Sequence, residues 1–245
     1  MARETGILYG LGVGPGDPEL ITLKAARILN SADVVYAAAS SKNSYSLAVN
    51  IARPHIPDLT QIQMLRFPMT KDQAEKESAW RENARILVKD LEKGKIVAFL
   101  TLGDSMTYST YGYVLRYVKS LAPHIPIISV PGITAYQASA ACLNEPLVEG
   151  EEALLILSGV KGGDCIRKFS DKPENIVFMK AYRNITDISA ALEELNLLDK
   201  SVAIKSCGLP DQEIIRNVAS LKQKPPNYWT LILTKRHKHD VPEES

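Results

Sequence analysis

The chain has 245 residues, of which 45% are apolar and 23% charged, a composition typical of a soluble globular protein with one large or two modest domains. The net charge of +1 argues against an overall positive field for nucleic acid or an anionic membrane. The start of the chain lacks a signal-peptide core, and no apolar run approaches the roughly 20 residues of a membrane helix. The three cysteines form no CxxC pattern, so we expect a protein of the reducing cytoplasm.

The chain opens with an apolar strand that runs into a glycine-rich segment, residues 6–18. The dinucleotide-binding spacing G-x-G-x-x-G fails here, because it would need glycine where Pro15 or Asp17 stands. Asp17 would also repel a pyrophosphate at the start of the helix that we expect over residues 19–31. The glycines therefore either admit a ligand other than phosphate or let two chain segments pack tightly.

The first half continues as alternating strands and helices. We expect strands over residues 32–36, 96–100 and 125–130, and helices over residues 45–52, 71–93, 111–121 and 136–143. Gly94 closes the long charged helix, whose charges we expect to face solvent. This order predicts a mostly parallel sheet with helices on both faces.

The stretch 101–110 follows a buried strand and precedes a helix. It therefore places Gly103 and Asp104 at the carboxyl edge of the sheet, where open α/β sheets bind ligands. The simpler alternative is an ordinary turn, in which Gly103 supplies conformational freedom and Asp104 caps the next helix.

The second half has shorter connections. We expect strands over residues 153–157, 175–180, 201–205 and 228–234, and a helix over residues 188–198. Short turns between strands favour a mixed sheet, so we expect two α/β domains, residues 1–134 and 135–245. His237 and His239 form an H-x-H pair near the C-terminus, which we expect to be solvated rather than metal-bound.

Four motifs in order resemble the tetrapyrrole methylases: Gly-Leu-Gly-Val-Gly-Pro-Gly-Asp at 10–17, Leu-Gly-Asp at 102–104, Val-Pro-Gly-Ile-Thr at 130–134, and Gln212 after a small-residue turn. The resemblance spans nearly the whole chain and implies two α/β domains that hold S-adenosylmethionine in a cleft between them. Residues 100–111, with Phe67-Pro-Met69 and Trp80, resemble the precorrin-2 C-20 methyltransferases of cobalamin synthesis, including the cobalt-factor II enzymes. Ser105 stands where those relatives usually have proline.

The resemblance also implies the residues that bind the cofactor. They fall in five short segments: Pro15; Leu102, Gly103, Asp104, Met106 and Thr107; Thr134 and Ala135; Lys180, Ala181 and Tyr182; and Cys207 and Gly208. Two of them have a plain structural alternative, since Thr134 could cap a helix and Cys207 could be a small buried residue. A homodimer is expected by resemblance alone.

The implied chemistry needs little from the protein. A sulfonium methyl is already activated, so we expect in-line placement in a dry site and no protein-bound metal, with any cobalt carried by the tetrapyrrole. The candidates for a general base are Asp104, Tyr108, Tyr111 and Tyr228, and an orienting or stacking role suits the tyrosines better. The substrate carboxylates call for basic side chains, for which the candidates are Arg66, Lys161, Arg183 and Lys205.

Two alternatives stay open. One is a methylase of the same fold with a different acceptor, such as another corrin carbon, an rRNA base or ribose, or diphthamide. The other is a tetrapyrrole- or nucleotide-binding module without catalysis. The near-neutral charge argues against a large RNA partner.

Overall fold

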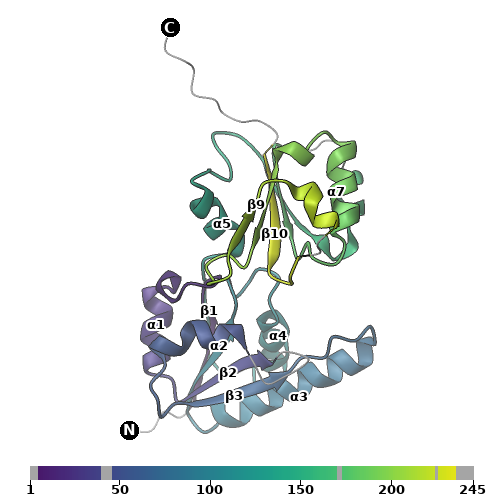
Figure 1. Cartoon of the computed structure of the whole chain (residues 1–245). Helices are drawn as coiled ribbons and strands as arrows, with labels where there is room; N and C mark the ends of the chain where they lie inside the picture. The colour runs from purple at the N-terminus through teal and green to yellow at the C-terminus, as the bar shows by residue number, and fades with distance from the viewer. Residues whose placement is uncertain (1–4, 40–45, 170–172, 224–225, 236–245) are drawn as a thin grey trace. The chain divides into compact units, whose positions relative to one another are not determined.

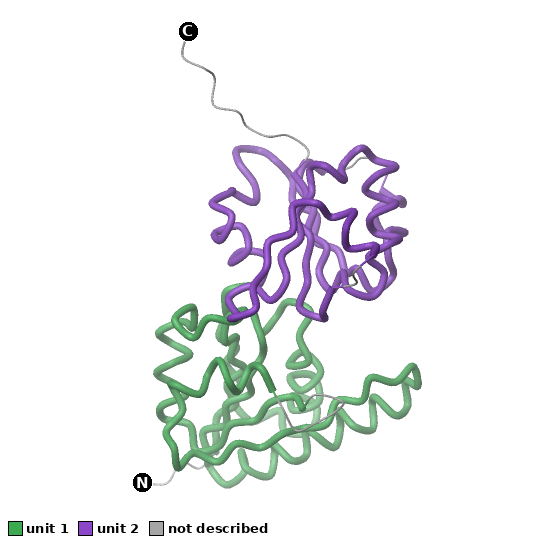
Figure 2. Tube along the Cα trace, viewed as in Figure 1, with its two compact units in different colours: residues 1–134 green, residues 135–245 purple. Residues whose placement is uncertain are grey.

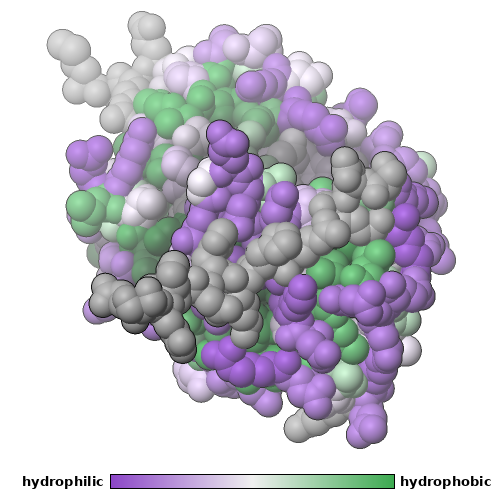
Figure 3. Space-filling model, turned by 90° about the horizontal axis from the view of Figure 1, so that it is seen from above, coloured by the Kyte–Doolittle hydropathy of each residue, from purple (hydrophilic) through white to green (hydrophobic). Residues whose placement is uncertain are grey.

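The computed structural model describes residues 5–39, 46–169, 173–223 and 226–235, and the expectation for His237 and His239 lies outside them. The chain forms two compact units, residues 1–134 and residues 135–245 (Figure 2). None of the helices in the described ranges is both long and apolar enough to cross a membrane. Hydrophilic side chains cover much of the face shown in Figure 3, with smaller hydrophobic groups between them.

The first unit is built on a five-stranded parallel sheet in the order β3-β2-β4-β1-β5. Its strands are β1 (Ile7–Gly12), β2 (Val34–Ala39), β3 (Gln61–Arg66), β4 (Ile96–Thr101) and β5 (Ile127–Val130). The predicted parallel sheet is confirmed. Because all five strands point the same way, the loops that follow them meet at one edge of the sheet.

Helices cover both faces of this sheet (Figure 1). They are α1 (Leu23–Asn30), α2 (Leu47–Ala52), α3 (Gln73–Leu91) and α4 (Tyr111–Leu121). Residues of α1 and α2 pack on one side in a cluster with Leu11 and Leu100, while α3 and α4 pack on the other with Leu8 and Phe99. Alternation of side chains along β1 and β4 produces these two cores.

The helix expected over residues 19–31 is instead two helices. A 3₁₀ helix, η1 (Pro18–Leu20), is capped by Asp17, whose carboxylate accepts from the backbone N–H of Glu19 at 2.9 Å. Thr22 then caps α1, since its hydroxyl accepts from the N–H of Ala25 at 3.2 Å. Two good capping residues five positions apart therefore start two helices.

A buried polar cluster ties β2 to the end of α3. The Tyr36 hydroxyl donates to Asp90 Oδ2 at 2.8 Å, and Lys95 Nζ lies 2.8 Å from Asp90 Oδ1. Burial alone would raise the pKa of Asp90, but the hydrogen bonds from Lys95 and Tyr36 hold it below its usual value.

The second unit has a mixed sheet in the order β6-β7-β10-β8-β9, as predicted. Its strands are β6 (Leu154–Ser158), β7 (Asn175–Met179), β8 (Ser201–Lys205), β9 (Glu213–Ile215) and β10 (Thr230–Lys235). Only β6 and β7 pair in parallel, and the other three pairings are antiparallel. The sheet thus differs from the first unit in the way the short connections indicated.

The helices of the second unit lie on both sides of its sheet (Figure 1). They are α5 (Ala135–Leu143) on one side, and α6 (Asp164–Arg167), α7 (Ile185–Glu194) and the 3₁₀ helix η5 (Val218–Lys222) in the core on the other. Two further 3₁₀ turns of this unit are η3 (Gly159–Lys161) and η4 (Leu198–Lys200), and η2 (Arg53–His55) belongs to the first unit. The helix expected over residues 188–198 lies three to four residues earlier in the structure, where α7 begins at Ile185 and ends at Glu194.

Candidate functional site

Three loops are bonded together at the carboxyl edge of the first sheet. After β1 and β4, Val13 donates its N–H to Thr101 O at 3.0 Å, and Gly14 and Gly103 exchange two backbone hydrogen bonds of 3.2 and 2.7 Å. The loop after β5 packs against both, because a Cβ on Gly132 would lie 2.3 Å from Gly103 O. The glycines of the opening motif therefore let chain segments pack tightly, one of the two uses expected of them.

Asp104 holds two of these loops together. Its Oδ1 accepts from the N–H of Met106 at 2.9 Å and from the Thr107 hydroxyl at 3.1 Å, and its Oδ2 accepts from the N–H of Gly132 at 3.0 Å. The alternative in which Asp104 caps the next helix is wrong, since Thr110 occupies the N-cap of α4. With three donors on its carboxylate, Asp104 is suited to shaping the loops rather than to taking a proton.

Ser105 is fully buried, and its hydroxyl donates to Val130 O at 3.1 Å. The hydrogen bond ties the loop after β4 directly to the last residue of β5. A side-chain hydrogen bond thus constrains the loop at the position where the resembling relatives carry proline. The sequence identified the departure but not this partner, which is 25 residues away along the chain.

Two side chains of the same loop face solvent. Met106 is 61% exposed and Tyr108 is 47% exposed. Tyr108 also has φ of 50°, a left-handed conformation that a bulky residue adopts only under constraint. Nearby, Leu102 and Thr107 are half-buried, whereas Pro15 and Thr134 are buried. The exposed pair is therefore one part of this edge that is available to a large ligand.

Tyr111 does not fit the role of a general base. It has no exposed surface, and its ring lies in the core beside Phe99. Its hydroxyl pairs with Ser129 Oγ at 3.0 Å, and burial raises its pKa. The first strand makes room for it, because a Cβ on Gly10 would lie 2.0 Å from the tyrosine ring. Tyr111 is a packing residue.

Most of the remaining predicted residues share one edge of the second sheet, whereas Ala135 is the first residue of α5. Lys180, Ala181 and Tyr182 follow β7, Cys207 and Gly208 follow β8, and Tyr228 precedes β10. These ends coincide because β7 and β8 both run antiparallel to β10, which lies between them. The edge is closed by the N–H of Ala181 donating to Thr230 O at 3.1 Å and that of Gly208 donating to Gln212 Oε1 at 2.7 Å. The side chain of Gln212, the last of the four sequence motifs, thus stabilises the turn after β8.

Strained backbone occurs at this edge as well. Lys180 has φ of 58° and Ser206 has φ of 52°, although neither is glycine or asparagine. Burial lowers the pKa of Lys180. It also raises the pKa of the Cys207 thiol, which keeps that side chain protonated and agrees with a small buried residue.

An aromatic cluster flanks the same edge. The Tyr182 and Tyr228 rings meet at 5.1 Å and 62°, and the Arg183 guanidinium lies 5.4 Å from the Tyr182 ring centre. Burial, followed by the neighbouring Tyr182, raises the pKa of Tyr228. Tyr228 therefore remains a phenol at neutral pH and is suited to stacking or donating a hydrogen bond rather than to accepting a proton.

The four basic candidates divide into two pairs. Arg66 and Lys205 each have a carboxylate nearby, Glu75 at 3.6 Å and Glu213 at 3.4 Å. Lys161 and Arg183 are exposed and have no carboxylate partner among the described residues. The second pair is the more available to an anionic substrate.

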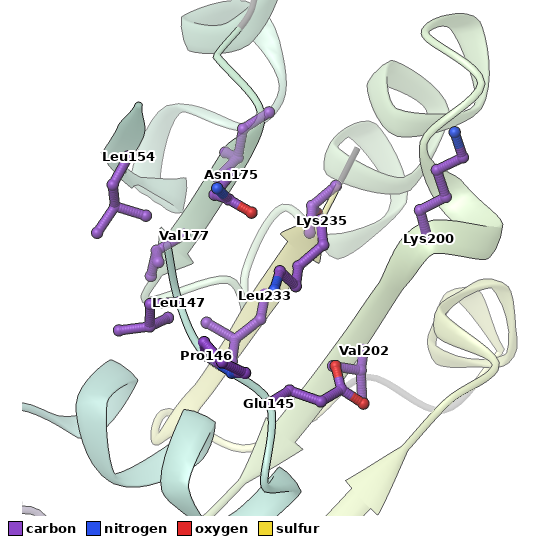
Figure 4. A pocket seen from close by; sticks show the side chains of 12 residues that line it. Glu145, Pro146, Leu147, Leu154, Asn175, Val177, Lys200, Val202, Leu233 and Lys235 are labelled. Carbon is purple, nitrogen blue, oxygen red and sulfur yellow. The ribbon is translucent and has the colours of Figure 1, made fainter. Parts of the chain in front are cut away.

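A small pocket lies elsewhere, on the α5 side of the second sheet (Figure 4). Glu145, Val177 and Leu233 contribute to its lining, and it offers about 30 Å³ to water-sized molecules. The buried Asn175 Oδ1 lacks a donor there, which a bound water would supply. No predicted site residue lines this pocket, so it is separate from the candidate site. Within the described ranges, no cluster of His, Cys, Asp and Glu has the composition to hold a metal.

Comparison with known proteins gives a consistent result. The family model of the tetrapyrrole (corrin/porphyrin) methylases matches residues 7–222. The chain is 36% identical to a cobalt-precorrin-2 C(20)-methyltransferase of Salmonella typhimurium, over 94% of this chain and 97% of that protein. It is 40% identical to a probable cobalt-precorrin-2 C(20)-methyltransferase of Methanocaldococcus jannaschii over 71% of each chain. It is 31% identical to a precorrin-2 C(20)-methyltransferase of a Sinorhizobium species, over 93% and 94%.

Solved structures agree on the fold. The uroporphyrin-III C-methyl transferase of Thermus thermophilus, complexed with S-adenyl homocysteine, matches with a TM-score of 0.68 and 23% identity, over 94% of this chain and 92% of that one. At this identity the likeness is one of fold.

Proposed function

Because the chain belongs to the tetrapyrrole (corrin/porphyrin) methylase family, we propose that it transfers a methyl group from S-adenosylmethionine to C-20 of precorrin-2 or its cobalt form in cobalamin biosynthesis. The observation that carries the proposal is the 36% identity to a C(20)-methyltransferase over nearly the full length of both chains. The relatives named for the cobalt form are the more similar, at 36% and 40% against 31%. We therefore expect cobalt-precorrin-2 to be the better acceptor.

The residues present fit a cofactor of this kind. The predicted residues of the first unit lie in loops that hydrogen bonds order at the carboxyl edge of its sheet, where open α/β sheets bind ligands. The second edge offers a small buried residue, Ala181, beside aromatic rings. We assign cofactor binding to Pro15, Leu102, Gly103, Met106, Thr107, Thr134 and Ala135, and to Lys180, Ala181, Tyr182, Cys207 and Gly208. Asp104 shapes the first of these loops.

The bound cofactor supplies an activated methyl group, so the protein's task is placement and exclusion of water. Among the proposed bases, Asp104 is occupied by three donors and Tyr111 is buried. Tyr108 and Tyr228 remain, as groups that orient the macrocycle or donate a hydrogen bond to it. The geometry thus favours catalysis by positioning over catalysis by a strong base.

The test is a turnover assay with purified protein. Methyl-labelled S-adenosylmethionine is incubated with precorrin-2 or cobalt-precorrin-2, and the product is examined by mass spectrometry and by NMR at C-20. We expect a product heavier by one methyl group, with the label at C-20, and faster turnover of the cobalt form. Absence of product with both macrocycles would refute the proposal, and a label on another carbon would correct the acceptor position. Sedimentation of the same sample tests the expected homodimer.

A further inference from the structure

Arginine and aromatic side chains line the surface where α3 and α4 meet in the first unit. The Trp80 and Tyr113 rings are stacked, with centres 3.9 Å apart and planes 5° apart. The Arg116 guanidinium lies 5.2 Å from the Tyr113 ring centre, and that of Arg81 lies 5.9 Å from the Tyr117 ring centre. We call these five residues the arginine–aromatic face.

Among the described residues, neither arginine of this face takes part in an ion pair. Both are exposed, and neither has a carboxylate partner within the part of the chain that the structure describes. Glu77 stands four residues before Arg81, the favoured spacing for a helical ion pair, yet its Oε1 accepts from Gln73 Nε2 at 2.7 Å. Helix α4 carries no acidic residue at all. Two guanidiniums are therefore held on rings with their N–H groups open to an anion.

The position of the face relates it to the candidate site. Helix α4 begins at Tyr111, directly after the loop that exposes Met106 and Tyr108 at the carboxyl edge of the sheet. Side chains on a helix lean toward its N-terminus, and Arg116 accordingly reaches the ring of Tyr113, three residues earlier. Its guanidinium is thus directed toward the edge where the exposed pair lies.

We propose that Arg116, held on the Tyr113–Trp80 stack, binds a carboxylate side chain of the tetrapyrrole acceptor, with Arg81 as a second contact. The inference rests on the proposed function, because it takes the acceptor to be a macrocycle with a rim of carboxylates. Planar guanidinium groups bind carboxylates through paired N–H donors, and a ring that fixes the guanidinium reduces the entropy lost on binding. The arginine–aromatic face would then help to select acceptors by their acidic rim.

The first test compares Arg116→Gln with the matched control Arg85→Gln, an exposed arginine of α3 that pairs with Glu82 at 3.3 Å. We expect Arg116→Gln to raise KM for the acceptor about tenfold, with kcat and the Kd for S-adenosylmethionine unchanged. Arg81→Gln should give a smaller increase in KM, and Arg85→Gln none. Equal KM values for the wild type and Arg116→Gln, in a protein that methylates the tetrapyrrole, would overturn the inference.

A second measurement separates charge recognition from a structural role and needs no turnover. Uroporphyrin III, a stable porphyrin with a carboxylate rim, and its methyl ester are titrated and followed by visible absorbance. Arg116→Gln should weaken binding of the acid about tenfold and leave binding of the ester unchanged. An equal loss with both would show that the substitution only disturbs packing and would refute the role. Failure of the wild type to methylate either macrocycle refutes the proposed function instead, since the titration still reports on Arg116.

Discussion

Replacing Asp104 tests whether its hydrogen bonds to the loops after β4 and β5, here called the Asp104 clamp, are needed for cofactor binding. In Asp104→Ala, the N–H groups of Met106 and Gly132 and the Thr107 hydroxyl lose their acceptor. Each bond is partly exposed, so we take about 1 kcal/mol for each rather than the larger values of buried charged pairs. The free energy of unfolding should fall by about 3 kcal/mol, and the Kd for S-adenosylmethionine should rise at least about tenfold because the loops are no longer ordered.

Calorimetric titration and urea unfolding measure the two effects on the same samples. Asp72 provides the matched control, because its carboxylate also caps a turn, accepting from the N–H groups of Ala74 and Glu75 at 2.8 and 3.3 Å, at the start of α3. Asp72→Ala should cost about 1 kcal/mol and leave the Kd unchanged. If Asp104→Ala bound the cofactor as tightly as the wild type, the clamp would have no part in binding. If Asp72→Ala weakened binding equally, the effect would reflect general stability.

Three further predictions concern the stability of the first unit. Gly132→Ala should destabilise the unit by several kcal/mol in urea unfolding, because its Cβ would meet Gly103 O at 2.3 Å, whereas Gly112→Ala has open space and should be neutral or stabilising by about 1 kcal/mol. Tyr111→Phe should lose about 1 kcal/mol of stability and keep full methyl transfer, and loss of activity in a folded variant would restore Tyr111 as a catalytic residue. The pKa of Asp90 is lowered by folding, so its contribution is present above about pH 4, the unfolded value, and is lost as pH falls through the folded value. Urea midpoints measured from pH 6 to 3 should therefore fall less steeply for Asp90→Asn than for the wild type.

The sequence predicts most strands of the two sheets, because they are short apolar runs. It does not predict β3 and β9, whose glutamine, arginine and glutamate residues interrupt the apolar pattern. It also predicts α4 at its observed ends, residues 111 and 121, where the helical spacing of apolar residues is clear. It fails over residues 19–31, where Asp17 and Thr22 compete to start a helix and periodicity cannot show which one succeeds. Where two capping residues of similar strength stand close together, tertiary packing rather than the local sequence determines where the helices begin.

For the candidate site, the sequence proposes the residues but not their hydrogen-bond partners. Asp104 stands out in the sequence, yet its bond to Gly132 depends on β5 lying beside β1 in the sheet, an order that no local pattern reveals. Tyr111 shows the opposite error. Its position at a helix start predicts an edge residue, but Gly10, 101 positions earlier in the sequence, leaves the space into which its ring packs.

Strained backbone occurs at both of the sheet edges where the predicted site residues lie. Five described residues other than glycine have positive φ. Asn144 and Asn196 follow helices, where asparagine in this conformation is an ordinary helix end. The others are Tyr108, Lys180 and Ser206, which occupy the loops after β4, β7 and β8, each costing about 1–3 kcal/mol. Glycine would remove that cost at any of the three, so side chains are kept there at the expense of stability. Tyr108 is half exposed beside Met106, in the stretch where the chain resembles C-20 methyltransferases, and strain at that point fits a side chain held in place for the acceptor.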